Sequence, residues 1–359
     1  MVTPANSAET GIRPTLAQVA ALAGVSASTA SLSFSGAGPI AEQTKQRVLA
    51  AALELDYGGP DPRARSLRTG RSGIIAVVME DRIRDAFRDP MVVTMLDGIA
   101  DEIGAAGYSL LLLTDSVERQ QGGLRDSPMD AALLLGCSTD LDPAVAVLSR
   151  RQVPLVGVEA QARVGLHLVD VENRAGSRQG AQHLHDLGHR RVGILTLPMD
   201  RPHTRGALTP EWEQASVAYT GLERLAGVRD VFPDAPAVVA AGSLPEEGAL
   251  AAHTLLDAHP DLTAIVGQSD LIALGAIQAA EERGLSVPAD LSVLGFDGAS
   301  IDGLTGRLLT TIVQPSVEKG RAAARMALAA LLAAADAPLQ TVVFPVELRL
   351  GDTTAPPRN

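Results

Sequence analysis

Short apolar runs alternate with longer amphipathic stretches along most of the chain, and this pattern constrains the fold more than any other feature. The expected strands cover residues 74–79, 109–114, 131–135, 154–158, 167–171, 192–197, 238–241, 264–267 and 292–296. The expected helices cover residues 90–106, 175–187, 245–258, 271–283 and 316–335. Strands that alternate with helices form parallel sheets with helices on both faces. The sequence therefore predicts a doubly wound α/β region, in which a ligand would bind beyond the carboxyl ends of the strands.

The N-terminal part of the chain has a different pattern, that of short helices joined by a glycine turn. Thr15 is placed to cap a helix whose apolar face begins at Leu16. Gly24 ends this helix, because glycine adopts the left-handed conformation at little cost, and Ser26 caps a second helix. This arrangement is typical of the helix-turn-helix that places its second helix in the major groove of DNA. An ordinary helical hairpin is the alternative for so short a segment.

A third helix and a linker complete the N-terminal region. The helix is expected over residues 42–55, with Lys45 available to a DNA phosphate and Tyr57 at the end of the small domain. Residues 58–62 are rich in glycine and proline and indicate a linker. Residues 64–69 allow one or two helical turns, and we expect so short a helix to order only on DNA beside a partner chain.

The net charge is distributed unevenly between the two regions. The chain of 359 residues has a formal net charge of −12. Residues 13–72 contain seven Lys or Arg and four Asp or Glu, so they carry +3 and the remainder carries −15. The basic excess lies on the DNA-reading region, and acidic repulsion elsewhere would discourage unspecific DNA contact. A DNA reader joined to a large domain of the small-molecule-binding type predicts a ligand-controlled transcription factor.

These residues also resemble the lactose/galactose-repressor family of bacterial transcription regulators. The N-terminal match comprises T-L-x-x-V-A-x-x-A-G-V-S-x-x-T-x-S, T-K-x-R-V-x-x-A-x-x-x-L-x-Y and A-R-S-L-R-T-G-R, which begin at Thr15, Thr44 and Ala64. Further fragments follow in the family's order, among them residues 172–176, 187–192, 224–227, 269–275, 287–297 and 309–315. The resemblance implies an N-terminal all-α helix-turn-helix DNA-binding domain with a hinge helix. A periplasmic-binding-protein-like α/β effector domain of two doubly wound subdomains would follow.

The resemblance also implies domain boundaries. We expect a disordered N-terminus over residues 1–12, a DNA-binding domain over 13–59, a linker and hinge helix over 60–72, and an effector-binding and dimerisation domain over 73–359. Within the last domain, we expect the chain to cross between subdomains near residues 159–165 and 296–302, and a further crossing near the end is left open.

The DNA contacts that the resemblance implies lie on the second helix and on the hinge. The expected DNA-binding residues are Thr15, Leu16, Ser26, Ala27, Ser28, Thr29, Ser31, Leu32, Lys45, Tyr57, Ala64, Arg65 and Leu67. The family inserts the leucine at the position of Leu67 into the minor groove, whereas a linker leucine packed on the effector domain is the alternative. Leu32 stands where many members have a base-contacting arginine, which leaves open an orphan regulator with altered DNA reading.

The effector contacts that the resemblance implies lie at strand ends. The expected residues are Glu159, Arg224, Ser269, Asp270, Phe296 and Asp297. Carboxylates and a guanidinium at such ends can bind the hydroxyl groups of a sugar bidentately. Alternatively, Asp270 and Asp297 cap helices or brace the subdomains. Met91 and Val92 replace an aromatic pair of the family, which disfavours a purine held between two rings.

The sequence disfavours an enzyme and a metal site. It contains neither a glycine-rich nucleotide-binding loop nor a G-x-S-x-G nucleophile elbow, so we expect no catalysis and no cofactor. His183, His185 and His189 do not share a helix face and indicate a helix end more than a metal site. The long insertion at 201–222 is interpreted as a lid over the cleft or as a surface excursion, and docking of Trp212 is favoured over stacking on a sugar.

Location and partners follow from the same observations. The single cysteine, Cys137, excludes an intrachain disulfide, and we recognise no signal peptide and no membrane-spanning run, so a cytoplasmic protein is expected. We expect a repressor that binds palindromic double-stranded operator DNA as a homodimer, controlled by a small molecule such as a sugar or a related metabolite. A solute-binding protein without a transcriptional role is the alternative.

Overall fold

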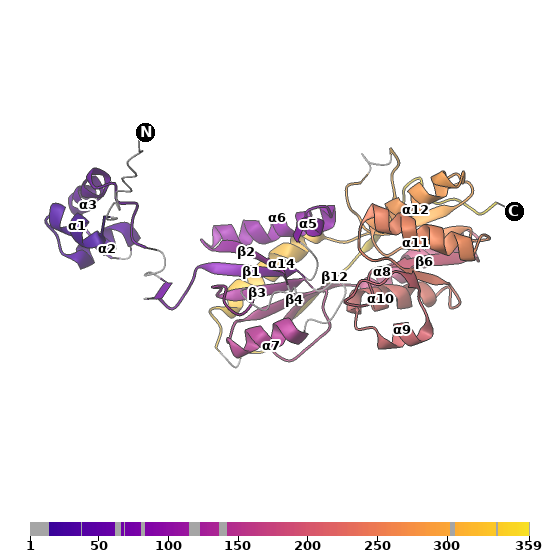
Figure 1. Ribbon diagram of the computed structural model, residues 1–359, viewed down its shortest axis with the longest axis horizontal. Helices are drawn as coiled ribbons and strands as arrows, with labels where there is room; N and C mark the ends of the chain where they lie inside the picture. Colours follow the sequence, from indigo (N-terminus) through magenta and orange to yellow (C-terminus); the bar gives the residue numbers. More distant parts are fainter. Residues whose placement is uncertain are drawn as a thin grey trace, which may run out of the picture. The chain divides into compact units, whose positions relative to one another are not determined.

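The chain folds into two compact units, residues 1–72 and residues 73–359, in a computed structural model (Figure 1). We call them unit 1 and unit 2. The structure describes residues 14–36, 38–61, 66–67, 69–79, 83–114, 123–135, 142–301, 306–334 and 337–358. The N-terminus over residues 1–12, for which disorder is expected, and residues 64, 65 and 68 of the expected hinge helix lie outside the described residues.

The described part of unit 1 contains the helices α1 (Leu16–Leu22), α2 (Ala27–Ser35) and α3 (Glu42–Glu54). Between α1 and α2 the chain turns at Gly24, whose φ of +65° lies in the left-handed region that favours glycine. The helices share one small core, formed by Val19, Ala20, Ala23, Ala30, Val48, Ala51 and Ala52. The predicted helix-turn-helix is confirmed.

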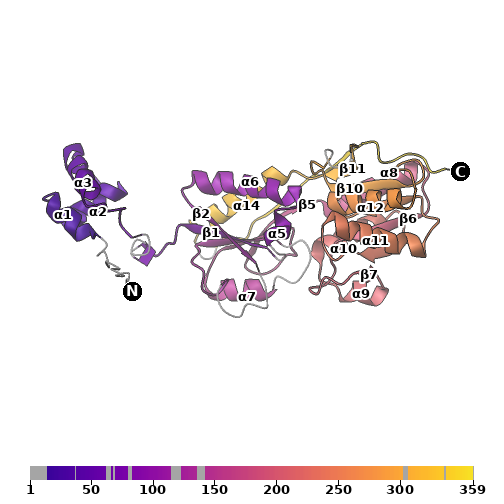
Figure 2. The ribbon, with the colours of Figure 1, turned by 45° about the horizontal axis from the view of Figure 1, so that its top comes forward.

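Unit 2 contains two sheets, each of which belongs to one subdomain (Figures 1 and 2). The first sheet has the order β12-β5-β4-β3-β1-β2 and is parallel throughout. Its strands are β1 (Ile74–Met79), β2 (Ser109–Thr114), β3 (Ala131–Leu135), β4 (Leu155–Val158), β5 (Leu166–Val171) and β12 (Thr341–Phe344). The second sheet has the order β13-β11-β10-β9-β6-β8-β7, and only its two edge pairs are antiparallel. Its strands are β6 (Val192–Thr196), β7 (Gly206–Ala207), β8 (Ala237–Val239), β9 (Ala264–Gly267), β10 (Ser292–Asp297), β11 (Thr310–Val313) and β13 (Glu347–Arg349).

Helices cover both faces of each sheet. Those of the first subdomain are α5 (Ile83–Ala86), α6 (Pro90–Ala105), α7 (Asp142–Arg150) and α14 (Ser316–Ala330). Those of the second are α8 (Asn173–Asp186), α9 (Pro210–Ala215), α10 (Tyr219–Arg229), α11 (Pro245–Ala258) and α12 (Asp270–Glu282). Alternate residues of β1 and β3 pack against α6 and α14 on one face and against α7 on the other. In the second sheet, α11 and α12 pack on one face and α8 and α10 on the other. The predicted doubly wound fold is confirmed.

Two glycines allow α6 and α14 to pack in close contact. A Cβ atom on Gly98 would lie 2.2 Å from the carbonyl oxygen of Val317. A Cβ atom on Gly320 would lie 2.1 Å from the carbonyl oxygen of Met95. Real Cβ atoms cannot approach backbone atoms so closely, so neither position accepts a larger residue without a shift of the helices. The contact fixes α14 on the sheet and with it Lys319, which precedes Gly320.

The crossings between subdomains differ from the sequence prediction, which places them near residues 159–165 and 296–302. The chain crosses after β5 and again after β11. The prediction is wrong by one strand in each case, because β5 still pairs with β4 and β11 still pairs with β10 before the chain leaves the sheet. A third crossing joins β12 to β13, between Phe344 and Glu347.

The insertion at residues 201–222 forms β7, α9 and the start of α10. Trp212, in α9, is partly buried and packs against the apolar core on the α10 side of the second sheet. The hydroxyl of Ser216 donates a hydrogen bond of 2.7 Å to the carbonyl of Met199, which ties the insertion to the end of β6. The tryptophan is therefore docked on its own subdomain.

The described residues contain neither a membrane-spanning helix nor a metal cluster. No single described helix is long and apolar enough to cross a membrane. The pair α1 and α2 satisfies this test only when taken together, by length and composition alone, across a bend of 104°. No group of three His, Cys, Asp or Glu side chains suited to a metal ion occurs in the described part of the chain. His183 contacts the hydroxyl of Thr354 at 3.0 Å, and His189 contacts that of Thr263 at 2.9 Å.

Candidate functional site

The exposed face of α2 carries the side chains that the sequence predicts to read bases. Ala27, Ser28 and Leu32 are exposed, and Leu32 has 39% of its surface accessible. Ser28 and Leu32 are four residues apart and therefore share one helix face, next to the half-buried Ser31. This face is small and uncharged. It offers methyl groups for thymine and one hydroxyl, but it contains no arginine that could bind guanine.

Hydroxyl side chains fix the start of α1 and α2. Thr15 accepts a hydrogen bond from the backbone N–H of Gln18, and the Gln18 side chain accepts one of 2.8 Å from the N–H of Thr15. Ser26 accepts a bond of 3.1 Å from the backbone N–H of Thr29. Leu16 is half-buried against the core of unit 1. Thr15 and Ser26 therefore orient the helices, and both remain exposed at the helix starts.

The other residues expected at DNA differ in accessibility. Lys45 is half-buried on α3. Tyr57 packs its ring edge-on against a phenylalanine of α2, with ring centroids 5.7 Å apart. Leu67 is 87% exposed, while Ala64 and Arg65 lie outside the described residues. Tyr57 thus contributes to the core of unit 1, whereas Leu67 presents a large apolar side chain to solvent.

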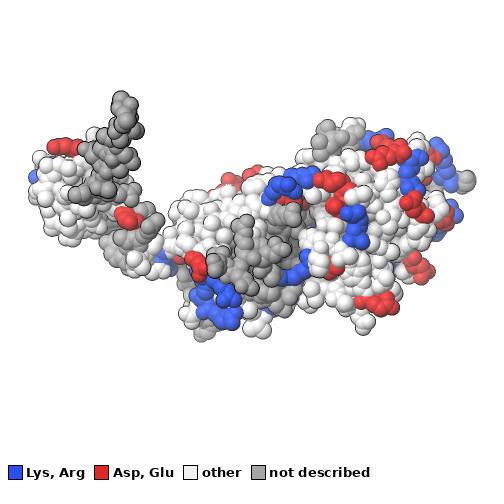
Figure 3. All heavy atoms as spheres, in the orientation of Figure 1, with Lys and Arg blue, Asp and Glu red and all other residues white. Residues whose placement is uncertain are grey.

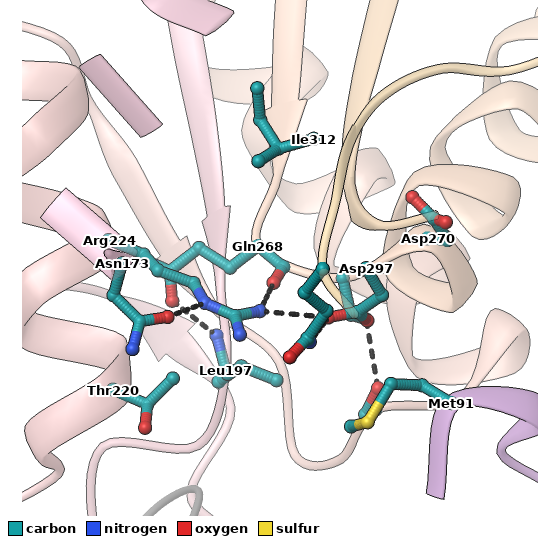
Figure 4. Close-up of polar contacts among 12 residues, drawn as sticks. Met91, Asn173, Leu197, Thr220, Arg224, Gln268, Asp270, Asp297 and Ile312 are labelled. Carbon is teal, nitrogen blue, oxygen red and sulfur yellow. Dashed lines mark hydrogen bonds and ion pairs between the residues drawn. The ribbon is translucent and has the colours of Figure 1, made fainter. Parts of the chain in front are cut away.

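In unit 2, a buried arginine of the second subdomain lies where the two subdomains meet. Arg224 is held on α10, which packs closely on α8 because a Cβ atom on Gly227 would lie only 2.3 Å from the carbonyl oxygen of Arg174. The Arg224 guanidinium donates to the side chain of Asn173 at 2.8 Å and to the carbonyl of Gln268 at 2.6 Å (Figure 4). Most of its donors are therefore used within the second subdomain.

Two carboxylates complete the surroundings of Arg224. Nη2 of Arg224 lies 3.0 Å from Oε2 of Glu159, and Nη1 lies 3.2 Å from Oδ1 of Asp297. The guanidinium carbon also lies 3.7 Å from the centre of the Phe296 ring, within the range of a cation–π contact. Glu159 follows β4 of the first sheet, whereas Arg224 and Asp297 belong to the second subdomain. The Glu159–Arg224 pair therefore joins the two subdomains.

A buried lysine forms the second partner of Glu159. Lys319 is fully buried on α14, and its ammonium group contacts Oε1 of Glu159 and Oε1 of Gln314. Burial alone would raise the pKa of Glu159, but the charges of Lys319 and Arg224 and their hydrogen bonds hold it below its ordinary value. Glu159 is thus an ionised carboxylate that bridges two cations in the interior.

The pKa of Asp297 shifts upward, in the opposite direction to that of Glu159. Burial, together with the nearby charges of Asp89 and Glu159, raises the pKa of Asp297 to about 7, although Arg224 and the hydrogen bond of 2.7 Å from Gln314 act against this rise. Its backbone φ is +119°, and that of Glu159 is +52°, so both acids have conformations that non-glycine residues rarely adopt. Such backbone strain is concentrated at functional sites.

Two of the residues that the sequence places at the effector lie apart from Arg224. Asp270 accepts hydrogen bonds from the hydroxyl of Thr311 and, at 2.7 Å, from the N–H of Ala299, and Figure 4 shows it separated from the Arg224 cluster. Burial and the charge of Asp297 raise the pKa of Asp270 well above its ordinary value. Ser269 caps α12 and accepts a bond of 2.8 Å from Ser243. The contacts of Asp270 are those of a brace between strand ends.

Other bonds between the subdomains surround the Glu159–Arg224 pair. The hydroxyl of Tyr219 donates a bond of 2.6 Å to Asp170, and the hydroxyl of Thr220 donates one of 3.2 Å to the carbonyl of Glu159. An exposed ion pair of 2.6 Å joins Arg88 to Glu246. These bonds connect β4, β5 and the start of α6 to α10 and α11, and they hold the subdomains together.

A cavity of about 120 Å³ lies between the subdomains beside this cluster. Its lining is mostly apolar, with a few polar groups from both sides. The lining residues are Met79, Asp85, Ala86, Asp89, Val92, Met95, Leu135, His203, Ala241, Gly242, Ser243 and Leu244. Drug-sized ligands occupy pockets of roughly 300–1,000 Å³. The cavity as it stands is therefore smaller than the pockets that hold drug-sized molecules.

Sequence reasoning does not identify four residues of the cluster. Lys319, Asn173, Gln268 and Gln314 are all buried and contact Arg224, Glu159 or Asp297. For Lys319 a signal exists in the sequence. It lies four residues before Ala323, and both project onto the apolar face of α14, where a lysine is unexpected unless it is paired.

The pKa of Asp297 predicts how the stability of unit 2 depends on pH. The folded carboxyl, with a pKa of about 7, binds a proton more tightly than the unfolded one, whose ordinary pKa is 3.8. The folded state therefore holds more protons between these values, and this contribution to stability falls as the pH rises through that window. Asp297→Asn should flatten the dependence when urea midpoints are measured from pH 4.5 to 7.5. The control is Asp234→Asn, because Asp234 is exposed, and its urea midpoints should depend on pH as those of the parent do. If the urea midpoint of Asp297→Asn followed pH in parallel with that of the parent, the prediction would be contradicted.

Comparison with known proteins places this geometry among bacterial regulators. Residues 15–59 match the lacI family of bacterial regulatory proteins, and residues 181–354 match the periplasmic binding protein-like domain. An HTH-type transcriptional regulator of Mycolicibacterium smegmatis is 34% identical over 88% of this chain and 90% of its own length. The transcriptional repressor CytR of Escherichia coli is 30% identical over 86% of this chain and 87% of its own length. The solved complex of the regulator CelR with cellobiose is 26% identical, covers 95% of this chain and 100% of its own, and has a TM-score of 0.67.

Proposed function

Because the chain belongs to the lacI family of bacterial regulatory proteins, we propose that it is a repressor of transcription whose operator affinity is set by a sugar or a related metabolite. It is a DNA-binding transcriptional regulator with a small-molecule effector domain. The name of CytR supports repression, and the cellobiose bound to CelR supports a sugar. The relatives are transcriptional regulators and not enzymes, and we assign no catalytic step to this chain. A regulator acts where the DNA is, so we place it in the cytoplasm.

The observation that carries the effector proposal is the buried pair of Glu159 and Arg224 between the subdomains. An effector that offers hydroxyl groups can exchange hydrogen bonds with both side chains, and with Asp297 beside them. Phe296, under the guanidinium, keeps Arg224 in place for this role. We retain Ser269 and Asp270 in the proposed set at the edge of the site. In this proposal, DNA binding is assigned to residues 13–59 and the hinge to residues 60–72.

Two measurements test the proposal. A panel of sugars and metabolites that includes cellobiose should contain a compound that raises the melting temperature of unit 2, because a ligand of the folded state stabilises it. The same compound should change the affinity for DNA selected from a random pool, and that affinity should fall with salt. Failure of the protein to bind any selected duplex at low salt would refute the proposal that it binds DNA. A compound that stabilises the protein without changing DNA affinity would refute the control by effector.

We further propose that the DNA-bound form is a homodimer on a palindromic operator. A single copy of unit 1 offers few base contacts, and two copies on symmetric half-sites multiply these contacts. Light scattering at micromolar concentration should give about twice the mass of the chain, 37.2 kDa. A monomer both free and on selected DNA would contradict the proposal.

The uncharged reading face of α2 predicts a change of base preference when an arginine is introduced. Leu32 is exposed and favours thymine methyl groups, whereas an arginine at this position can form two hydrogen bonds to guanine. Leu32→Arg should therefore shift the selected base pair opposite this residue toward guanine, by a contact worth about 1–3 kcal/mol. Selection from random DNA measures the change, with Leu22→Arg, which is also exposed, as the control. An unchanged preference at every position would show that Leu32 does not face the bases.

A further inference from the structure

Three arginines gather beside a surface hollow in the first subdomain. Arg150 and Arg151 lie at the end of α7, and Arg125 lies in the turn that precedes β3. Together with Val147 they line a hollow of about 200 Å³. Arg151 donates hydrogen bonds to the carbonyls of Leu124 and, at 2.7 Å, of Ser127. Arg151 thus anchors the turn and holds Arg125 beside the hollow.

The hollow lies near the point where unit 2 begins. The backbone N–H of Gly73 donates a bond of 2.9 Å to the carboxylate of Asp130, and the N–H of Asp130 donates one of 2.8 Å to the carbonyl of Ile74. The turn that carries Arg125 directly precedes Asp130. Because α7 connects the parallel strands β3 and β4, it ends at the edge of the sheet where these strands start. The three arginines therefore lie at the amino-terminal edge of the first sheet, opposite the Glu159–Arg224 cluster.

The three arginines beside the hollow form a local excess of positive charge on an acidic domain. Arg125 and Arg150 are exposed, and within the described residues neither side chain forms a hydrogen bond or an ion pair. The chain outside residues 13–72 carries −15. On the face of unit 2 that Figure 3 shows, acidic and basic side chains are interspersed over a mostly uncharged surface. Arg125 and Arg150, which have no carboxylate partner among the described residues lining the hollow, are suited to an external anion.

We propose that Arg125 and Arg150, beside the turn that Arg151 holds, contact backbone phosphates of the DNA that unit 1 recognises. Guanidinium groups bind phosphate oxygens through paired hydrogen bonds, and exposed arginines supply many phosphate contacts in protein–DNA complexes. An open hollow whose described lining contains one apolar residue suits a polymer that passes over it, whereas small ligands are enclosed by mostly apolar walls. The three arginines lie at the edge of unit 2 where the chain enters from the linker that follows unit 1. The inference rests on the proposed DNA-binding function.

The salt dependence of DNA binding tests this inference on the full chain. Arg125→Gln and Arg150→Gln are combined, and Arg151 is kept because it holds the turn. The slope of the logarithm of the DNA association constant against the logarithm of the salt concentration should become shallower by about 0.9 for each phosphate that the variant no longer neutralises. For the two substitutions together, the slope should change by about 1 to 2. The control variant combines Arg178→Gln and Arg191→Gln on the second subdomain, where both arginines are exposed. It changes the net charge equally and should keep the parent slope.

The outcomes separate this inference from the proposed function. A parent protein that binds selected DNA, together with equal slopes for the parent and the Arg125/Arg150 variant, would overturn only the arginine contact. Equal reductions of the slope in both double variants would also overturn it, because net charge alone would then explain the effect. If 10 mM inorganic phosphate stabilises the parent but not the variant, and the slopes are equal, the hollow binds a small anion instead. A parent without salt-dependent DNA binding would refute both proposals.

Discussion

Replacing Lys319 with alanine is expected to destabilise unit 2 by about 3–5 kcal/mol, the usual cost of removing one partner of a buried ion pair. Lys319 is fully buried, and its ammonium group contacts Glu159 and Gln314. Without it, the Glu159 carboxylate would keep only Arg224 as a cationic partner, in an interior where water cannot hydrate the charge. The cavity left by the side chain adds to the cost. Urea unfolding followed by fluorescence measures the effect, because the single tryptophan, Trp212, lies in unit 2.

A double-mutant cycle distinguishes removal of the ion pair from removal of packing. Lys319→Met keeps most of the volume but leaves Glu159 poorly compensated, so it should remain strongly destabilising. Combining it with Glu159→Gln removes both charges of the Lys319–Glu159 pair and leaves Arg224 with Asp297 at 3.2 Å, so it should recover part of the stability, because no carboxylate is then left without its lysine. If the losses in free energy of unfolding from the two single substitutions simply added in the double variant, the charges of Lys319 and Glu159 would not interact, and the buried ion pair would contribute nothing beyond packing.

The sequence predicts the order of the elements well where the pattern is local. The glycine turn at Gly24, the cap at Ser26 and the strand β1 all follow from a few neighbouring residues, and the structure has them. Edge strands are different. The short strands β12 and β13 lie at sheet edges, β11 lies next to β13, and only their pairing with β5, β11 and β10 respectively distinguishes them from loops. The unrecognised strand β11 places the second crossing one strand too early, whereas the first is misplaced because the sequence of β5 does not show which sheet the strand joins.

The candidate site is predicted only in part, because the sequence indicates which residues end a strand but not which of them meet. Glu159, Arg224 and Asp297 are brought together, and Phe296 lies under the guanidinium. Asp270 also follows a buried strand, at the start of α12, yet its carboxylate contacts Thr311 and Ala299.

The partner of Glu159 illustrates the same limit. Lys319 comes 160 residues later in the chain, and the close packing of α14 on α6 at Gly320 brings it to the site. A local pattern contains no information about such a separation. The charge balance of the site therefore becomes visible only when both subdomains are in place.

Leu67→Ala should weaken binding to selected DNA by about one to two orders of magnitude, which corresponds to about 1.4–2.8 kcal/mol. Leu67 is 87% exposed in a segment that the resemblance assigns to the minor groove. An apolar wedge between base steps unstacks and kinks the duplex, and the bend brings more of the protein surface onto the DNA. Alanine is too short to hold the step open, so the bent complex would lack its support. Fluorescence anisotropy at fixed salt measures the affinity.

The matched control is Leu53→Ala, because Leu53 is 85% exposed on α3 of the same unit and is not among the expected DNA contacts. It removes the same amount of apolar surface, so an effect of hydrophobic surface in general would appear equally in both variants. The effector that the thermal-shift panel identifies should bind the Leu67→Ala protein as it binds the parent, since the substitution lies outside unit 2. Equal DNA affinity of parent, Leu53→Ala and Leu67→Ala would show that Leu67 is an ordinary linker residue. A weakening confined to Leu67→Ala, accompanied by reduced DNA bending in a ring-closure or gel-phasing assay, would identify the side chain as the wedge.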